Sequence, residues 1–185
     1  MIQLKFFGIG GQGIVTAAKM LSEAVSLGEG KFASTVPAYG HERRGAPVNT
    51  SIVVDDEPVL QNCFVYEPDL VMVLDPGVVD KGVNVAAGIH PESILVLNTS
   101  QMQTVDRFAQ MGFKKVYYAD GTQVAAQETG RGIPNASMLG ALAKTGLVGI
   151  EAVAEAVEHT FGKKAGAANA QAARRVYDET KCNCN

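Results

Sequence analysis

The sequence contains few cysteines and no tryptophan. Its three cysteines, Cys63, Cys182 and Cys184, are too few for a disulfide framework and favour a reducing compartment. An iron–sulfur cluster normally takes four thiolates, so the pair near the end of the chain does not predict one. The sequence therefore predicts no metal site in this chain.

Long apolar segments are also absent. Runs such as 70–74 and 94–97 have the length of strands and are too short to span a bilayer. Lys5 interrupts the only early apolar run, and no small-residue cleavage site follows it, so no signal peptide is expected. The expected location is the cytoplasm, with no membrane contact.

Charge of either sign is modest. The chain has 16 Lys and Arg against 19 Asp and Glu, a formal charge of −3, which argues against nucleic-acid binding because that function needs a basic face. Of its 185 residues, 46% are hydrophobic and 19% charged, which excludes a largely disordered chain. The length suits one domain with a single sizeable core.

Apolar runs of strand length alternate with segments of helical spacing, which is typical of an α/β fold. We expect a single Rossmann-like three-layer domain with a mostly parallel central sheet and a helical C-terminal third. Strands are expected at residues 2–8, 32–36, 48–54, 69–75, 94–97 and 115–118. Helices are expected at residues 12–27, 121–128, 135–147, 149–161 and 165–180, with Asn135 as an N-cap.

A glycine-rich turn, residues 8–13, lies between the first strand and the first helix. Its glycines satisfy G-x-G-x-x-G, the turn that brings backbone N–H groups to a pyrophosphate at a helix N-terminus. A dinucleotide site also requires a carboxylate at the end of the second strand, but residues 34–37 contain none and Glu29 comes too early. Contact with an anion or a partner and simple tight packing are therefore equally favoured, and both are favoured above NAD binding.

A second candidate is the loop 39–47, in which Tyr39, Glu42, Arg43 and Arg44 lie between glycines. Arginine side chains bind carboxylates or phosphates with two parallel hydrogen bonds, and Glu42 could orient one of them. The alternative is a charged surface loop in which the glutamate and the arginines pair with one another.

Catalytic patterns are absent elsewhere. His41, His90 and His159 are isolated, and neither a nucleophile elbow nor a Walker lysine is present. Polar residues do follow three of the expected strands, at a sheet edge where ligands gather, although turn formation is favoured for them. These residues are Asp75, Asn98 and Asp120. No residue is therefore assigned a catalytic role, and the domain is expected to hold or position a partner molecule.

Residues 8–18 together with the loop 39–47 resemble the gamma subunits of the 2-oxoacid:ferredoxin oxidoreductases. The resemblance covers essentially the whole chain, because it extends to residues 56–59, 69–76, 134–135 and 138–141. The pairing of G-x-G-G-Q-G with E-R-R-G-A-P at this spacing is far more specific than either motif alone. The chain is therefore similar to the gamma domain of the pyruvate/ketoisovalerate type over residues 1–185.

The resemblance implies a non-redox subunit, inactive alone, of an enzyme of anaerobic metabolism. Such enzymes oxidatively decarboxylate a 2-oxoacid with thiamine diphosphate, transfer electrons through iron–sulfur clusters to ferredoxin, and form an acyl-CoA from CoA. It implies alpha, beta and delta (ferredoxin-like) partner subunits that carry these cofactors, while this chain binds none alone. Large subunit interfaces exposed in the isolated chain would allow it to form a homodimer. Residues 42–47 are closer to the pyruvate or branched-chain types, and pyruvate is the expected substrate.

We also expect the glycine turn and the loop to meet at one edge of the domain, because an anion-competent backbone and paired arginines suit one contact surface. There they are expected to contact the thiamine-bearing subunits and to shape the route by which CoA arrives. The residues expected to do so are Gly8, Gly10, Gly11, Gln12, Gly13, Tyr39, Glu42, Arg43 and Arg44. The alternatives are a stand-alone NAD-dependent oxidoreductase, a 2-oxoglutarate- or indolepyruvate-type subunit, and an assembly scaffold without a ligand.

Overall fold

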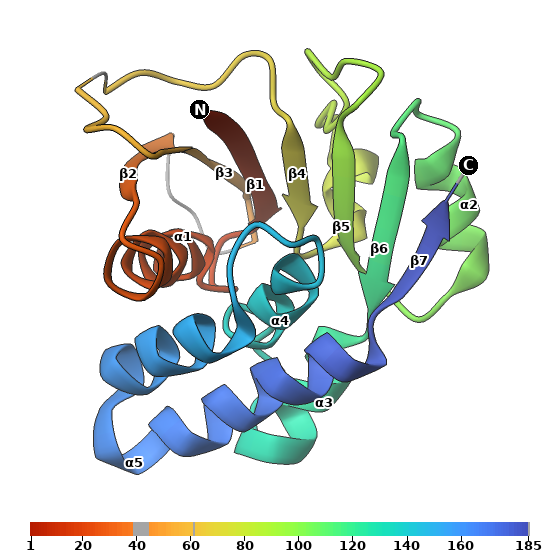
Figure 1. Cartoon of the computed structure of the whole chain (residues 1–185). Helices are drawn as coiled ribbons and strands as arrows, with labels where there is room; N and C mark the ends of the chain where they lie inside the picture. Colours follow the sequence, from red (N-terminus) through yellow and green to blue (C-terminus); the bar gives the residue numbers. More distant parts are fainter. Residues whose placement is uncertain (39–44, 61, 185) are drawn as a thin grey trace.

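The structure is a computed structural model that describes residues 1–38, 45–60 and 62–184. A seven-stranded sheet in the order β2-β3-β1-β4-β5-β6-β7 forms its middle layer (Figure 1). The strands are β1 (Ile2–Ile9), β2 (Phe32–Ala38), β3 (Pro47–Asp55), β4 (Leu70–Val73), β5 (Ile94–Asn98), β6 (Lys115–Ala119) and β7 (Lys181–Cys184). β1, β4, β5 and β6 are parallel neighbours, whereas β2, β3 and β7 join the sheet antiparallel.

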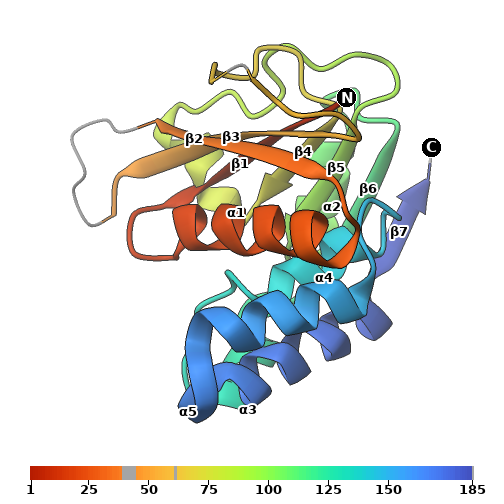
Figure 2. The ribbon, with the colours of Figure 1, turned by 60° about the vertical axis from the view of Figure 1, so that its left-hand side comes forward.

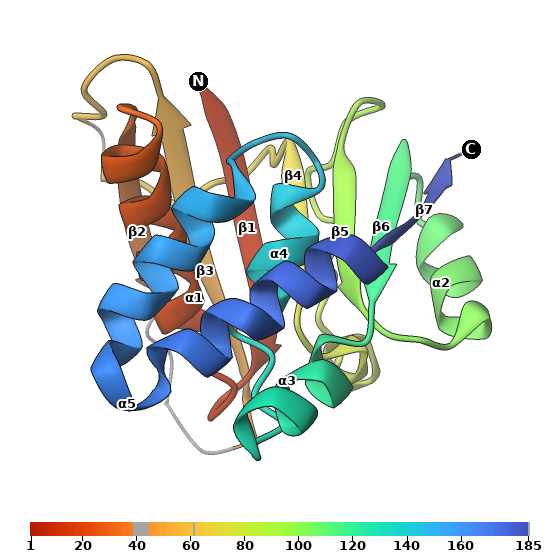
Figure 3. The same ribbon diagram turned by 60° about the horizontal axis from the view of Figure 1, so that its bottom comes forward.

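Helices cover both faces of the sheet, which confirms the expected α/β class. The helices are α1 (Ile14–Glu23), a π-helix η1 (Ala24–Gly28), a 3-10 helix η2 (Pro76–Lys81), α2 (Met102–Ala109), α3 (Gly121–Thr129), α4 (Ser137–Ala143) and α5 (Ile150–Glu179). One face carries α1, α3, α4 and α5, with the two arms of α5 outermost (Figures 2 and 3). The other face carries η2 and α2.

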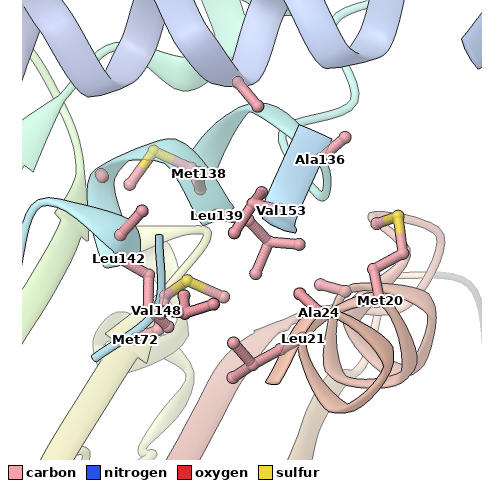
Figure 4. Packing of buried hydrophobic residues seen from close by; sticks show 14 of the residues in the cluster. Met20, Leu21, Ala24, Met72, Ala136, Met138, Leu139, Leu142, Val148 and Val153 are labelled. Carbon is pink, nitrogen blue, oxygen red and sulfur yellow. The ribbon is translucent and has the colours of Figure 1, made fainter. Parts of the chain in front are cut away.

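The larger core lies between the sheet and α1, α4 and α5 (Figure 4). Leu4 and Phe6 alternate along β1 toward this core, while Phe7 points to the smaller core beneath η2 and α2. All four residues of β4 are buried, as expected for a strand covered on both faces. At the centre of the larger core, Met72 of β4 lies near Leu21 of α1 and Leu142 of α4.

Small residues let α4 and α5 approach closely. A Cβ on Gly140 would lie 1.9 Å from the carbonyl oxygen of Ala173, so the position accepts no side chain. α5 itself breaks at Gly162, which has φ 64° and ψ −172°. This break confirms the prediction of two consecutive C-terminal helices, 149–161 and 165–180, separated near a glycine.

Several elements differ from the prediction. The sequence predicted neither η2, α2 nor β7, and the helix expected over 135–147 is only seven residues long. Asn135 is not the N-cap of that helix; its Oδ1 instead accepts a hydrogen bond from the N–H of Ala136. Cys182 in β7 is disulfide-bonded, which the small number of cysteines did not predict.

Glu29 links the N-terminal half of the chain to α5. Its Oε1 accepts a 2.7 Å hydrogen bond from the N–H of Gly149, the residue that precedes α5. The four first N–H groups of a helix lack partners within the helix, and a carboxylate there also interacts favourably with the helix dipole. In the part of the chain that the structure describes, no helix combines the length and the apolar character needed to cross a membrane.

Candidate functional site at the carboxyl edge of the sheet

The candidate site lies where β1 and β4 end side by side. The chain leaves β1 toward α1 on one face of the sheet and leaves β4 toward η2 on the other face. Open α/β sheets bind ligands in the crevice that such a divergence creates. The glycine turn follows β1 and Asp75 follows β4, so both border this crevice.

Three positions of the turn require glycine, for different physical reasons. Gly11 and Gly13 have φ values of 103° and 74°, a region that favours glycine. Gly8 is required for packing, because a Cβ there would lie 2.3 Å from Cδ1 of Ile14. A Cβ on Gly13 would lie 2.5 Å from Nδ2 of Asn135. Tight packing therefore accounts for the outer glycines of the motif.

The Gln12 side chain ties the turn to the neighbouring strand. Its Oε1 accepts a 2.9 Å hydrogen bond from the N–H of Ile9, and its Nε2 donates a 2.7 Å hydrogen bond to Oδ2 of Asp75. The other oxygen of Asp75 accepts from the N–H of Gly77 at 2.9 Å. Sequence reasoning noted Asp75 only as a strand-end residue, because nothing local indicates that Gln12 reaches it.

The turn is joined directly to the end of the predicted loop. The N–H of Gly10 donates to the carbonyl of Ala46 at 2.8 Å, and the N–H of Gly45 donates to the carbonyl of Gly10 at 3.2 Å. Pro47, the first residue of β3, pairs with Ile9. Residues 45–47 of the loop therefore lie against the glycine turn, whereas the predicted Tyr39, Glu42, Arg43 and Arg44 lie outside the described residues.

The geometry differs from a dinucleotide site in two respects. The strand beside β1 on this side is β3, which is antiparallel, and β2 lies one strand further out. Within the described residues, no strand end is therefore placed to supply the carboxylate that a ribose requires. In addition, the Asp75 carboxylate beside the turn follows β4 and already accepts a 2.7 Å hydrogen bond from Gln12 Nε2, so it does not take the place of that ribose ligand.

Hydrogen-bond donors gather instead at the start of α1. Among the described residues no side chain caps this helix, so its first N–H groups are donors that an anion could use. Asn135 is only 6% exposed, and among the described residues its Nδ2, beside Gly13, has no hydrogen-bond partner. Sequence reasoning treated Asn135 as a helix cap and missed this position.

Asn135 also lines a cavity of about 340 Å³ between the segment before α4 and the turn of α5. The cavity combines one cationic group, two amides and apolar walls. Its lining includes Thr129, Arg131, Ile133, Asn135, Phe161 and Asn169. This composition suits an anionic ligand with an apolar part.

A second cavity, of about 380 Å³, lies at the ends of β4, β5 and β6 and includes Gln12 and Asp75. Several of its polar side chains are already hydrogen-bonded within the protein. Nδ2 of Asn98 donates to the carbonyl of Leu74 and to Oγ1 of Thr122, both at 2.8 Å. Asp120 caps α3 through the N–H of Gln123 at 2.9 Å. The interpretation of Asn98 and Asp120 as structural strand-end residues is supported by these contacts.

The described histidines lie away from this edge and pair with carboxylates. His90 Nε2 lies 3.0 Å from Oδ1 of Asp69, and His159 contacts Glu23. His41 is outside the described residues. Within residues 1–38, 45–60 and 62–184, no three His, Cys, Asp or Glu side chains are grouped so that they could hold a metal ion.

Comparison with known proteins places this fold and this turn in one family. Residues 3–179 match the family described as pyruvate ferredoxin/flavodoxin oxidoreductase. The chain belongs to this family. It is 44% identical over 184 residues to the pyruvate/ketoisovalerate oxidoreductases common subunit gamma of Pyrococcus furiosus, with 98% of each chain covered.

Two further relatives of this oxidoreductase family agree over nearly the whole length. The pyruvate synthase subunit PorC of Methanothermobacter thermautotrophicus is 44% identical over 180 residues, 97% of this chain and 96% of the relative. The crystal structure of pyruvate oxidoreductase subunit PORC from Thermotoga maritima superimposes with a TM-score of 0.82 at 35% identity, covering 98% of both chains. The family recognised from the glycine turn and the 39–47 loop is thereby confirmed, as is the α/β fold.

Proposed function

We propose that the chain is the gamma subunit of a multi-subunit 2-oxoacid:ferredoxin oxidoreductase whose substrate is pyruvate. The holoenzyme converts pyruvate, CoA and two oxidised ferredoxins into acetyl-CoA, CO₂, two reduced ferredoxins and one proton. Its partners are alpha, beta and ferredoxin-like delta subunits, and the complex works in the cytoplasm. The names of the full-length relatives from Pyrococcus and Methanothermobacter support this proposal.

The redox cofactors belong to the other subunits in this proposal. Thiamine diphosphate supplies the carbanion-stabilising chemistry of the decarboxylation when it is bound in the holoenzyme. The described residues of this chain do not fit an iron–sulfur cluster, because no group of three metal-ligating side chains forms there. The gamma chain then acts as one domain over residues 1–185 that binds and positions.

The main support for this proposal is the contact between the glycine turn and the end of the loop. There, the N–H of Gly10 donates a 2.8 Å hydrogen bond to the carbonyl of Ala46. It places the segment that follows Arg44 directly beside the start of α1. The free N–H groups of α1 and Nδ2 of Asn135 are donors of the kind that phosphate groups take. CoA carries phosphates and a long less polar arm, so it suits this edge and the adjoining cavity of about 340 Å³.

The test uses the assembled holoenzyme with the variants R43A, R44A and N135D. Each variant removes an arginine or adds a carboxylate, and each is expected to raise KM for CoA about tenfold, which corresponds to one charged hydrogen bond. KM for pyruvate is expected to stay unchanged. The matched control is R107A, because Arg107 is an exposed arginine of α2 on the opposite face that pairs with Asp80. If R43A and R44A assemble normally with unchanged KM for CoA and unchanged turnover, the CoA contact is wrong.

The same variants separate the competing functions. A pure assembly scaffold predicts that all damage appears as loss of the complex, with normal KM in whatever complex remains. A stand-alone NAD-dependent enzyme predicts quenching of NADH fluorescence by the isolated chain. Purification from the native organism decides between the classes, because co-purified subunits with thiamine diphosphate and iron–sulfur clusters are expected. Assay of that complex with 2-oxoglutarate and indolepyruvate then tests the choice of pyruvate.

A further inference from the structure

An extended segment without helix or strand connects β3 to β4 at the amino edge of the parallel strands. We call its described residues, 56–60 and 62–69, the acidic arm. Figure 1 shows it in gold, crossing the end of the sheet opposite the arrowheads of β1 and β4. Structureless connections of this length are uncommon in compact domains and usually serve a function.

The acidic arm is held in place over residues 65–68. Val65 is 1% exposed, and its N–H donates a 3.0 Å hydrogen bond to Oγ of Ser51 in β3. The carbonyl of Tyr66 lies against Gly88, where a Cβ would lie only 1.8 Å from the carbonyl oxygen. The carbonyl of Pro68 accepts a 2.7 Å hydrogen bond from Oγ of Ser93. The backbone of residues 65–68 is therefore held against the domain, and it supports the neighbouring aromatic side chains.

Large apolar side chains nevertheless point away from the molecule. Leu60 is 92% exposed, Tyr66 73% and Phe64 45%. Phe64 and Tyr66 flank the buried Val65, and side chains of an extended chain alternate in direction, so both project outward. Exposed aromatic side chains on a rigid support are the residues that dominate binding energy at protein interfaces.

The charges of the arm all have one sign. It contains Asp56, Glu57, Glu67 and Asp69 and no lysine or arginine. Asp69 is paired with His90 at 3.0 Å and Asp56 with Lys31 at 3.6 Å. Glu57 and Glu67 are exposed and make no ion pair with the described residues. The apolar surface is therefore accompanied by two uncompensated negative charges.

We propose that the acidic arm is the docking surface for another subunit of the oxidoreductase, on which apolar pockets are bordered by lysine or arginine side chains. This inference rests on the proposed function as a subunit. Charge complementarity selects the occupant, because a second copy of this chain would bring an equally acidic arm to a symmetric contact and repel it. The arm lies at the amino edge, whereas the glycine turn lies at the carboxyl edge, so this contact is distinct from the CoA edge.

The test co-expresses all subunits and measures how much gamma chain co-purifies with the tagged alpha subunit. L60D and Y66D are expected to reduce it at least about tenfold, the effect of losing a central interface residue. The double variant E57K/E67K is expected to weaken assembly at low salt and to differ less from the wild type at high salt. M102D is the matched control, because Met102 is 50% exposed on α2 and far from the arm.

Thermal melting of the isolated variants shows that they fold, since the altered side chains are exposed. The inference is overturned if L60D and Y66D co-purify as well as the wild type. It is also overturned if they abolish only self-association of the isolated chain, measured by sedimentation, and leave the complex intact. If the wild-type chain assembles with no oxidoreductase subunit, the proposed function fails; if it assembles and the arm variants do too, only the docking surface fails.

Discussion

The variant Q12E tests whether the hydrogen bonds of the Gln12 side chain to Ile9 and Asp75, the Gln12 bridge, stabilise the protein. The change keeps the shape of the side chain but replaces the Nε2 donor with a carboxylate oxygen, 2.7 Å from Oδ2 of Asp75. Loss of a hydrogen bond to a charged group costs about 1.5–3 kcal/mol. Two unit charges about 4 Å apart repel by about 1 kcal/mol in water and about 4 kcal/mol near a protein surface. Because both side chains are half-buried, we expect Q12E to lower the free energy of unfolding by about 3–5 kcal/mol at pH 7.

The pH dependence of this loss has a definite sign. A proton shared by the two carboxylates removes their repulsion, so the folded state holds a proton at a pH where the unfolded state has released it. The folded pKa of the pair is therefore raised, and the destabilisation of Q12E is smallest in acid and grows as the pH rises through that value.

Urea unfolding at pH 7 and pH 4.5 measures both effects. Q12M, which removes the bridge without adding charge, is expected to cost about 2 kcal/mol and to show no such pH dependence. Adding D75N to Q12E supplies an amide donor opposite the new carboxylate and should recover most of the loss. A Q12E protein as stable as Q12M at pH 7, or a D75N change that only adds further damage, would refute the bridge as the cause.

Two further predictions concern stability. Thr50 Oγ1 on β3 is buried without a hydrogen-bond partner in the described part of the structure. T50V is therefore expected to raise the free energy of unfolding by about 1 kcal/mol. T35V is the control, expected to lower it, because Thr35 Oγ1 hydrogen-bonds to Oγ of Ser22 at 2.7 Å. The hydrogen bond from Arg174 holds the pKa of Glu151 below its ordinary value. The stabilisation from this ion pair is therefore present above the unfolded pKa of Glu151 and is lost as the pH falls through its lowered folded pKa. E151Q should then be less stable than the wild type at pH 7 and nearly equal to it in strong acid. An equal difference in stability at both pH values would exclude this pair as the source.

The elements whose signal is local could be predicted from the sequence. The strand–turn–helix unit around residues 8–13 follows from an apolar run, glycines and helical spacing within one short stretch. The buried strand at 70–73 follows from its continuous apolar run. The direction of β2 could not be predicted, because whether a strand pairs parallel or antiparallel depends on partners distant in sequence. β7 was missed because a short strand of polar and cysteine residues lacks an apolar pattern.

The candidate site was predictable only in part for the same reason. The glycine turn and the loop each carry a recognisable composition, and their contact was expected because backbone N–H groups and paired arginines both suit an anion. Asn135 reaches Gly13 across more than a hundred residues, and the sequence around it indicates a helix start just as well as a ligand donor. The link from Gln12 to Asp75 spans 63 residues and leaves no local pattern.

The layer of α4 and α5 over the larger core has a consequence for biosynthesis. The chain emerges from the ribosome with β1, α1, β4 and β5 first, and the part of the apolar face that α4 and α5 cover stays exposed until the last third of the protein is made. Domains fold as units during synthesis, and exposed apolar surface makes partly folded chains prone to aggregate. The nascent chain is therefore expected to depend on a chaperone until α5 has cleared the exit tunnel, and truncations before Gly162 should be insoluble.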